Sequence, residues 1–123
     1  MNRVFTGRIK SFAHALRGMG YLVRTQPNAR VHLLATVAVC MAGAYVGLGR
    51  DEWLWVSVAI VLVWGAEAFN TALEVLADAL HPERHPGIGR AKDVAAGAVL
   101  IAALGAAVIG VLIFAPHLAG LLG

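Results

Sequence analysis

Residues 67–78 read Glu67-Ala-Phe-Asn-Thr-Ala-Leu-Glu-Val-Leu-Ala-Asp78 and place acids within an apolar helix. The preceding run, residues 53–66, carries no charge. At about 100° per residue, the polar side chains share a stripe roughly 100° wide on one helical face: Glu67, Asn70, Thr71, Glu74 and Asp78. A charged side chain at the centre of a bilayer costs about 2.5–3.5 kcal/mol, so acids there usually face a partner, water or a ligand. The stretch therefore predicts a polar site on a membrane-spanning helix.

The composition is that of a membrane protein. Of the 123 residues, 59% are hydrophobic and 14% are charged, whereas ordinary soluble domains carry about 25% charged residues. Mean hydropathy is +0.74. The length fits one domain over residues 1–123, and we find neither a linker nor an internal repeat. The single cysteine, Cys40, excludes an intrachain disulfide.

Residues 5–24 predict an amphipathic helix. Apolar side chains recur there at spacings of three and four, with basic and polar side chains on the opposite face at the same spacing. The segment lacks a long apolar core, so we expect it to lie in the inner membrane interface and not to cross. Charges recur through Arg30, which is unlike a secretory signal.

Three apolar runs predict spanning helices over residues 29–48, 53–80 and 94–115. A polar loop over residues 81–90 separates the last two, since it contains two prolines and two glycines. We expect Asp93 to cap the third span and Pro116 to end it. The predicted fold class is an all-α membrane protein with an interfacial amino-terminal helix and three transmembrane helices per protomer.

The basic residues indicate the orientation. Arg50 alone lies between the first two spans. The other nine of the ten lie before the first span, at its start or between the last two spans: Arg3, Arg8, Lys10, Arg17, Arg24, Arg30, Arg84, Arg90 and Lys92. The positive-inside rule then predicts a cytoplasmic amino terminus and an external carboxyl terminus.

The acids divide by depth along the second span. Glu67 lies deepest, where it could take a proton from a lipid hydroxyl near the interface, and Asn70 could orient it. Glu74 at the wet end is the better ligand for Mg²⁺, which is held by one or two carboxylates together with substrate phosphates. Lys92 supplies positive charge for those phosphates, and the absence of a Gly-rich loop ending in Gly-Lys-Ser/Thr excludes a P-loop.

Three helices leave a polar stripe on the middle one difficult to shield, so we expect an oligomer with the stripe facing a cleft between helices. A lipid enzyme using this cleft is one interpretation. The alternative is a subunit of a proton- or cation-coupled transporter, because acids within the membrane also mark ion paths. The outer halves of the spans lack polar steps for such a relay, and inverted repeats are missing. We expect no nucleic-acid partner.

Residues 67–78, together with Gly89-Arg-Ala-Lys-Asp-Val-Ala-Ala-Gly-Ala-Val at 89–99, resemble the signature of the small prokaryotic integral-membrane diacylglycerol kinases, a family that includes undecaprenol kinases. The resemblance covers about residues 7–115. It implies a homotrimer in the bacterial inner membrane that transfers the γ-phosphate of ATP to a lipid alcohol with magnesium.

The resemblance also implies roles for single residues. Glu67 matches the catalytic base, with Asn70 beside it, and Glu74 matches a metal ligand next to the nucleotide. Positions that contact the nucleotide are matched by Glu83, His85, Lys92 and Asp93. We also assign Arg8 and His14 to the nucleotide and Ser11 and Arg30 to the lipid.

Two positions depart from the family pattern. Gln26 stands where the family usually has a glutamate that is a second metal ligand, and His14 stands where it often has a tyrosine. An amide oxygen of Gln26 can still bind a cation, but it brings no charge. Residues 25–33 resemble the undecaprenol kinase branch more closely than the proteobacterial diacylglycerol kinase branch, which favours undecaprenol as substrate.

Overall fold

The computed structural model describes residues 2–123. This part of the chain contains four helices joined by short connections. They are α1 (Arg3–Thr25), α2 (Pro27–Val46), α3 (Arg50–Leu80) and α4 (Pro86–Leu122). Helices α2, α3 and α4 contain 20, 31 and 37 residues, and each is long and apolar enough to cross a membrane. The prediction of an all-α, multi-pass membrane fold with three spans is confirmed.

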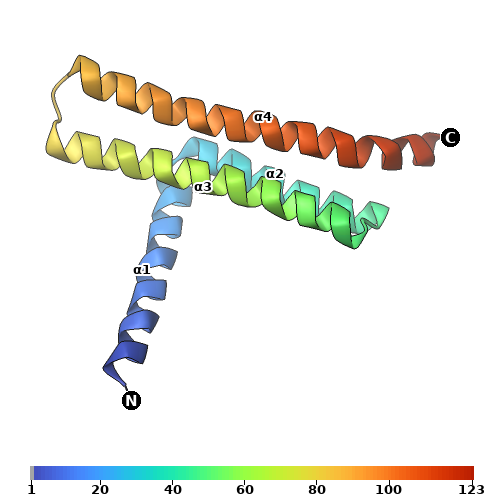
Figure 1. Ribbon diagram of the computed structural model, residues 1–123, viewed down its shortest axis with the longest axis horizontal. Helices are drawn as coiled ribbons and strands as arrows, with labels where there is room; N and C mark the ends of the chain where they lie inside the picture. Colours follow the sequence, from blue (N-terminus) through green and yellow to red (C-terminus); the bar gives the residue numbers. More distant parts are fainter. Residues whose placement is uncertain (1) are drawn as a thin grey trace.

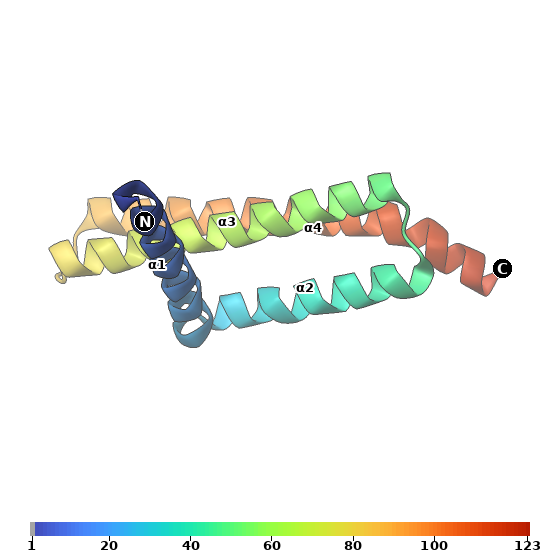
Figure 2. The ribbon, with the colours of Figure 1, turned by 90° about the horizontal axis from the view of Figure 1, so that it is seen from below.

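Helix α3 runs antiparallel to both α2 and α4, and α4 lies beside α3 along most of its length (Figure 1). The α2–α3 turn and the carboxyl terminus therefore lie at one end, and the start of α2 lies towards the end where α3 meets α4 (Figure 2). Polar residues of the α3–α4 loop and the basic α1 consequently gather at the same end of the protein.

Helix α1 projects away from the three long helices (Figures 1 and 2). Only its carboxyl end is anchored: Leu22 is buried, and Arg30 at the start of α2 donates hydrogen bonds to the carbonyls of Val23 and Arg24. The apolar face remains open, with Phe12 73% exposed. An exposed apolar face opposite a basic one suits a helix lying on a membrane surface.

The α2–α3 turn depends on two glycines. Gly47 has φ 73°, a left-handed conformation that favours glycine, and its N–H bonds to the Gly43 carbonyl at 3.0 Å. Gly43 itself lies under the Trp53 ring, where an added Cβ would come within 2.7 Å of Trp53 Cη2. The turn therefore depends on the Trp53 ring lying directly against the backbone of α2 at Gly43.

The third span begins earlier than expected, and Asp93 does not cap it. Helix α4 starts at Pro86, and His85 is its N-cap, since His85 Nδ1 accepts from the N–H groups of Gly87 and Ile88 at 3.0 and 3.4 Å. A proline at the first helical position costs nothing, because its missing N–H would have no helical partner there. Asp93 lies inside α4 on its exposed side.

Pro116 does not end α4, which continues to Leu122. Backbone hydrogen bonds are expensive to lose in hydrocarbon, and spanning helices accordingly tolerate proline. A contact with α3 also stabilises the segment beyond Pro116, because His117 Nε2 lies 2.8 Å from Glu52 Oε2 at the start of α3. The contact ties the two helix ends together.

Candidate active site

The buried face of α3 changes from apolar to polar along its length. Its buried residues follow helical spacing and form one continuous stripe: Val56, Ala59, Val63, Glu67, Asn70 and Thr71. Glu67 is 1% exposed, Thr71 4% and Asn70 8%. The same face that packs α3 into the protein thus carries the predicted site.

Burial of Glu67 within one chain corrects a premise of the sequence analysis. We expected three helices to leave the stripe unshielded, but the neighbouring α2 and α4 cover its deep end. Only the wet end is open, with Glu74 partly exposed and Asp78 exposed. Shielding of Glu67 therefore gives no argument for an oligomer.

Glu67 and Asn70 line a cavity of about 260 Å³ between the three long helices. Helix α2 contributes Asn28 and His32 to its wall, and α4 contributes only apolar side chains. All polar groups of the cavity thus come from α2 and α3.

Four buried side-chain atoms at this place have no hydrogen-bond partner among residues 2–123: His32 Nε2, Glu67 Oε2, Asn70 Oδ1 and Thr71 Oγ1. His32 Nε2 and Glu67 Oε2 are 3.5 Å apart, which is too long for a good hydrogen bond. Buried polar atoms are nearly always paired, so such a cluster indicates a place for a ligand or water.

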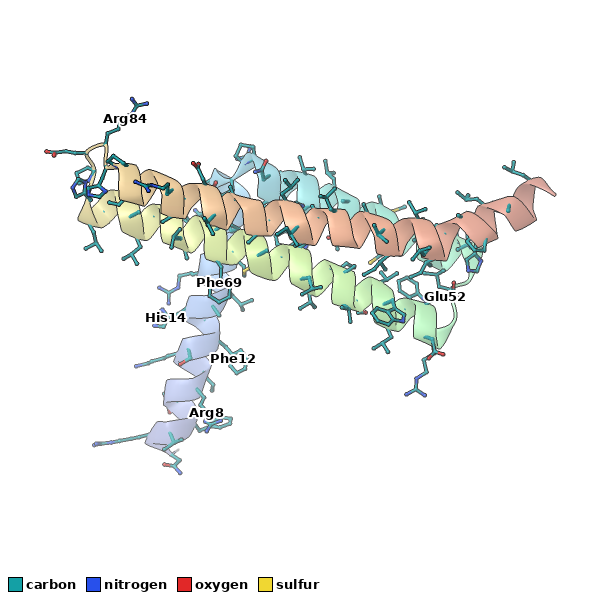
Figure 3. All side chains as sticks on the ribbon, turned by 45° about the horizontal axis from the view of Figure 1, so that its top comes forward. Arg8, Phe12, His14, Glu52, Phe69 and Arg84 are labelled. Carbon is teal, nitrogen blue, oxygen red and sulfur yellow. The ribbon has the colours of Figure 1, made fainter. Side chains whose placement is uncertain are left out.

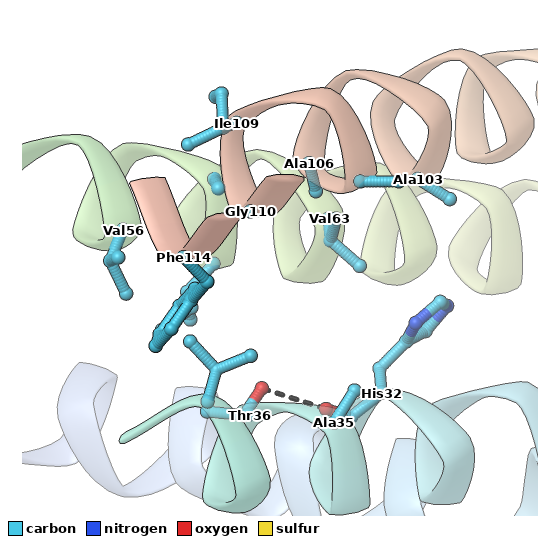
Figure 4. Close-up of a pocket in the computed structure, with 14 residues that line it drawn as sticks. His32, Ala35, Thr36, Val56, Val63, Ala103, Ala106, Ile109, Gly110 and Phe114 are labelled. Carbon is cyan, nitrogen blue, oxygen red and sulfur yellow. Dashed lines mark hydrogen bonds between the residues drawn. The ribbon is translucent and has the colours of Figure 1, made fainter. Parts of the chain in front are cut away.

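A second cavity, of about 330 Å³, continues towards the α2–α3 turn and is almost wholly apolar. Small residues of α4, including Ala106 and Gly110, form one wall (Figure 4). His32 and Ala103 line both cavities. The two cavities therefore adjoin at His32.

The remaining acids of the stripe lead towards the α3–α4 loop. Asn70 Nδ2 donates to Glu74 Oε1 at 3.5 Å, and Lys92 Nζ donates to Asp78 Oδ1 from the facing turn of α4. The structure thus brings Glu67, Asn70 and Glu74 onto one line, with the predicted phosphate-binding Lys92 beside its far end.

The loop residues have structural partners of their own. His81 Nδ1 contacts the Glu83 carbonyl at 3.0 Å, and the rings of His81 and His85 meet edge to face with centroids 5.4 Å apart. The Glu83 side chain is exposed. Neither Glu83 nor His85 lines the Glu67 cavity.

Residues predicted on or near α1 lie apart from that cavity. Arg8 and His14 are on the projecting helix (Figure 3), and so is Ser11, whose hydroxyl bonds to the Gly7 carbonyl at 3.1 Å. Arg30 is occupied at the α1–α2 junction. Gln26 lies at the same junction, where its amide donates to Thr25 Oγ1 at 3.3 Å.

The oxygen atoms of Asn70 and Glu74 fit a magnesium ion whose other ligands would be water and the phosphates of the substrate. Within residues 2–123 no group of three or more His, Cys, Asp or Glu side chains is placed to hold a metal. Mg²⁺ keeps several waters, however, and needs only one or two carboxylates beside substrate phosphates. Glu74 offers a carboxylate, and Asn70 offers an amide oxygen without a partner.

The sequence analysis assigned no role to Asn28 and His32. They are four residues apart, and Thr36 follows at the same spacing, so the three polar side chains share one face of α2. That spacing was a usable signal, but which neighbour they face depends on how α2 packs against α3.

Comparison with known proteins identifies the family. The family of prokaryotic diacylglycerol kinases matches residues 13–114, which is most of the chain. The chain belongs to this family. It is therefore a lipid kinase, and its three long apolar helices make it a multi-pass membrane protein.

Relatives in the family are named for two activities. An undecaprenol kinase of Bacillus subtilis is 40% identical over 118 residues, covering 96% of this chain and 93% of the relative. A diacylglycerol kinase of Synechocystis is 35% identical over 113 residues, covering 91% of this chain and 65% of the relative. A diacylglycerol kinase of Haemophilus influenzae is 27% identical over 97 residues, covering 79% and 82%.

Proposed function

We propose that this prokaryotic lipid kinase transfers the γ-phosphate of ATP to the hydroxyl of a membrane lipid alcohol at the cytoplasmic interface. The observation that carries the proposal is the buried Glu67 carboxylate, which faces a cavity and has an oxygen without a hydrogen-bond partner. Burying an acid in a membrane helix costs free energy, so such residues are rare and usually serve a function. Proton transfer from an alcohol is the function that suits it in a kinase.

The reaction needs little covalent chemistry from the protein. Glu67 accepts the proton of the lipid hydroxyl, whose oxygen forms a bond to the γ-phosphorus while the bond from that phosphorus to the bridging oxygen breaks. ADP leaves with the bridging oxygen. Asn70, one turn along α3, orients Glu67 or donates to a phosphate oxygen.

Nucleotide and metal occupy the wet end of the stripe in this proposal. Mg²⁺ supplies charge neutralisation for the phosphates, with Glu74 as its carboxylate ligand and Gln26 as an uncharged one. The remaining nucleotide contacts come from the α3–α4 region and α1: Arg8, His14, Glu83, His85, Lys92 and Asp93. Ser11 and Arg30 lie near the lipid headgroup.

Undecaprenol is the substrate we favour over diacylglycerol. The Bacillus subtilis undecaprenol kinase matches nearly the whole of both chains at 40% identity. The diacylglycerol kinases match at lower identity and cover less of this chain.

The setting is the bacterial inner membrane, with the amino terminus in the cytoplasm and the carboxyl terminus outside. The positive-inside rule supports this orientation, since nine of ten basic residues lie on the side of α1 and the α3–α4 loop. We further propose a homotrimer.

Glu67→Gln tests the proposal, because the isostere keeps the packing but cannot accept the proton. With radiolabelled ATP and a panel of lipid alcohols, we expect transfer to fall by about 10²–10⁴-fold. Glu52→Gln, at the other end of the same helix, is the matched control and should retain activity. Activity of Glu67→Gln within about tenfold of the wild type would reject Glu67 as the base.

A further inference from the structure

His32 on α2 faces the Glu67 carboxylate. Its Nε2 lies 3.5 Å from Glu67 Oε2, its side chain is 15% exposed, and neither atom has a hydrogen-bond partner among residues 2–123. A buried polar atom without a hydrogen bond destabilises the protein, so a bond between these two atoms would be favourable. A small closing movement would make them donor and acceptor.

Neighbouring groups hold the imidazole in this place. Thr36 Oγ1 donates to the His32 carbonyl at 2.7 Å and accepts from Trp64 Nε1 at 3.0 Å. The Trp64 ring also meets the His32 ring edge to face, with centroids 6.4 Å apart. Because Trp64 precedes Glu67 by one helical turn, α3 fixes both the carboxylate and the ring that faces it.

His32 lines both cavities, so its contact with Glu67 lies beside the space that we propose for the lipid substrate. Figure 4 shows His32 at the opposite end of the apolar cavity from Phe114. On its other side the ring borders the polar cavity of Glu67 and Asn70. A lipid hydroxyl in this cavity would therefore be next to both Glu67 and His32.

We propose that His32 is a positioning residue for Glu67. Its neutral imidazole donates Nε2–H to Glu67 Oε2, which fixes the carboxylate plane and leaves the other oxygen to accept the proton of the lipid hydroxyl. Hydrogen bonds of this kind are often long without substrate and tighten when it binds. This inference rests on Glu67 being the base of the proposed reaction.

Two substitutions of His32 separate positioning from packing. His32→Leu removes the donor and fills similar space, whereas His32→Gln keeps a neutral N–H donor. A misplaced catalytic group can cost about 10²-fold, so we expect His32→Leu to lower kcat by about that factor with the KM values for lipid and ATP nearly unchanged. His32→Gln should recover most of the loss.

His117→Leu is the matched control, since it removes the other histidine–glutamate contact, 2.8 Å at the opposite end of the protein. We expect it to leave kcat unchanged. A kcat for His32→Leu equal to that of His117→Leu would overturn the inference, and so would equal losses in His32→Leu and His32→Gln.

A spectroscopic readout does not depend on turnover. In ¹⁵N-histidine-labelled wild-type protein, we expect a protonated Nε2 resonance of His32 that shifts in Glu67→Gln and not in Glu52→Gln, which should shift His117 instead. A His32 resonance that ignores Glu67→Gln would overturn the contact even where His32→Leu fails to fold.

The two proposals fail in different ways. An active Glu67→Gln variant would reject Glu67 as the catalytic base, whatever the effect of the His32 substitutions. An inactive Glu67→Gln variant beside a fully active His32→Leu variant would reject only the role of His32.

Discussion

At the residue scale, Gln26 and Glu74 test how much anionic charge the metal needs. We propose both as ligands, but only Glu74 is charged. A carboxylate is a stronger ligand for hard cations than an amide oxygen, so Gln26→Glu should lower the magnesium midpoint of activity without changing lipid preference. Glu74→Gln is the reference and should raise that midpoint. A magnesium midpoint that Gln26→Glu leaves unmoved would place Gln26 outside the metal shell.

The stripe on α3 could be predicted because it depends on helical periodicity alone, and the structure places Glu67, Asn70 and Thr71 on one buried face. His32 could not be assigned in the same way. Its place opposite Glu67 depends on the packing of α2 against α3, fixed by contacts such as Trp64 with Thr36 that are 28 residues apart in sequence. Periodicity within one helix carries no information about that register.

At the element scale, the α2–α3 hairpin depends on the missing side chain of Gly43. A Cβ there would lie 2.7 Å from Trp53 Cη2 and 2.8 Å from Leu48 Cδ1, closer than real contacts allow. Overpacking a tight contact costs about 1–3 kcal/mol, so Gly43→Ala should lower the thermal unfolding midpoint in detergent. Gly65→Ala is the matched control, since nothing lies within 4 Å of its added Cβ.

Helix propensity favours alanine over glycine by about 1 kcal/mol, so Gly65→Ala should be neutral or stabilising. If Gly43→Ala unfolds at the same temperature as Gly65→Ala or above it, the close approach of Gly43 and Trp53 is not a constraint on the hairpin.

The boundaries of α4 show where reasoning from single residues failed. Asp93 and Pro116 have the local chemistry of a cap and a stop, yet α4 runs from Pro86 to Leu122. The Nδ1 of His85 caps the helix instead, and the tie between His117 and Glu52 holds its far end. Both features depend on histidines, which are not among the residues that usually mark the start or the end of a helix in a sequence.

At the scale of the whole molecule, the residues that we propose for the site lie in two regions of one chain. Glu67, Asn70 and His32 meet within the three long helices, whereas Arg8 and His14 lie on α1, which extends away from them (Figure 3). If Arg8 and His14 contact the nucleotide as we propose, α1 serves a site other than the cavity of its own chain. A closed ring of subunits would supply such a neighbour.

Mixed oligomers test this division. We expect Glu67→Gln and Arg8→Ala to be inactive or severely impaired alone, because each lacks one part of every site. When the two chains are unfolded and reassembled together in equal amounts, half of the sites have an intact Glu67 and half of those receive an intact Arg8 from the neighbour. About a quarter of the wild-type activity should therefore return. No recovery would mean that each chain completes its own site, and native mass spectrometry that found only monomers in mild detergent would reject the shared site outright.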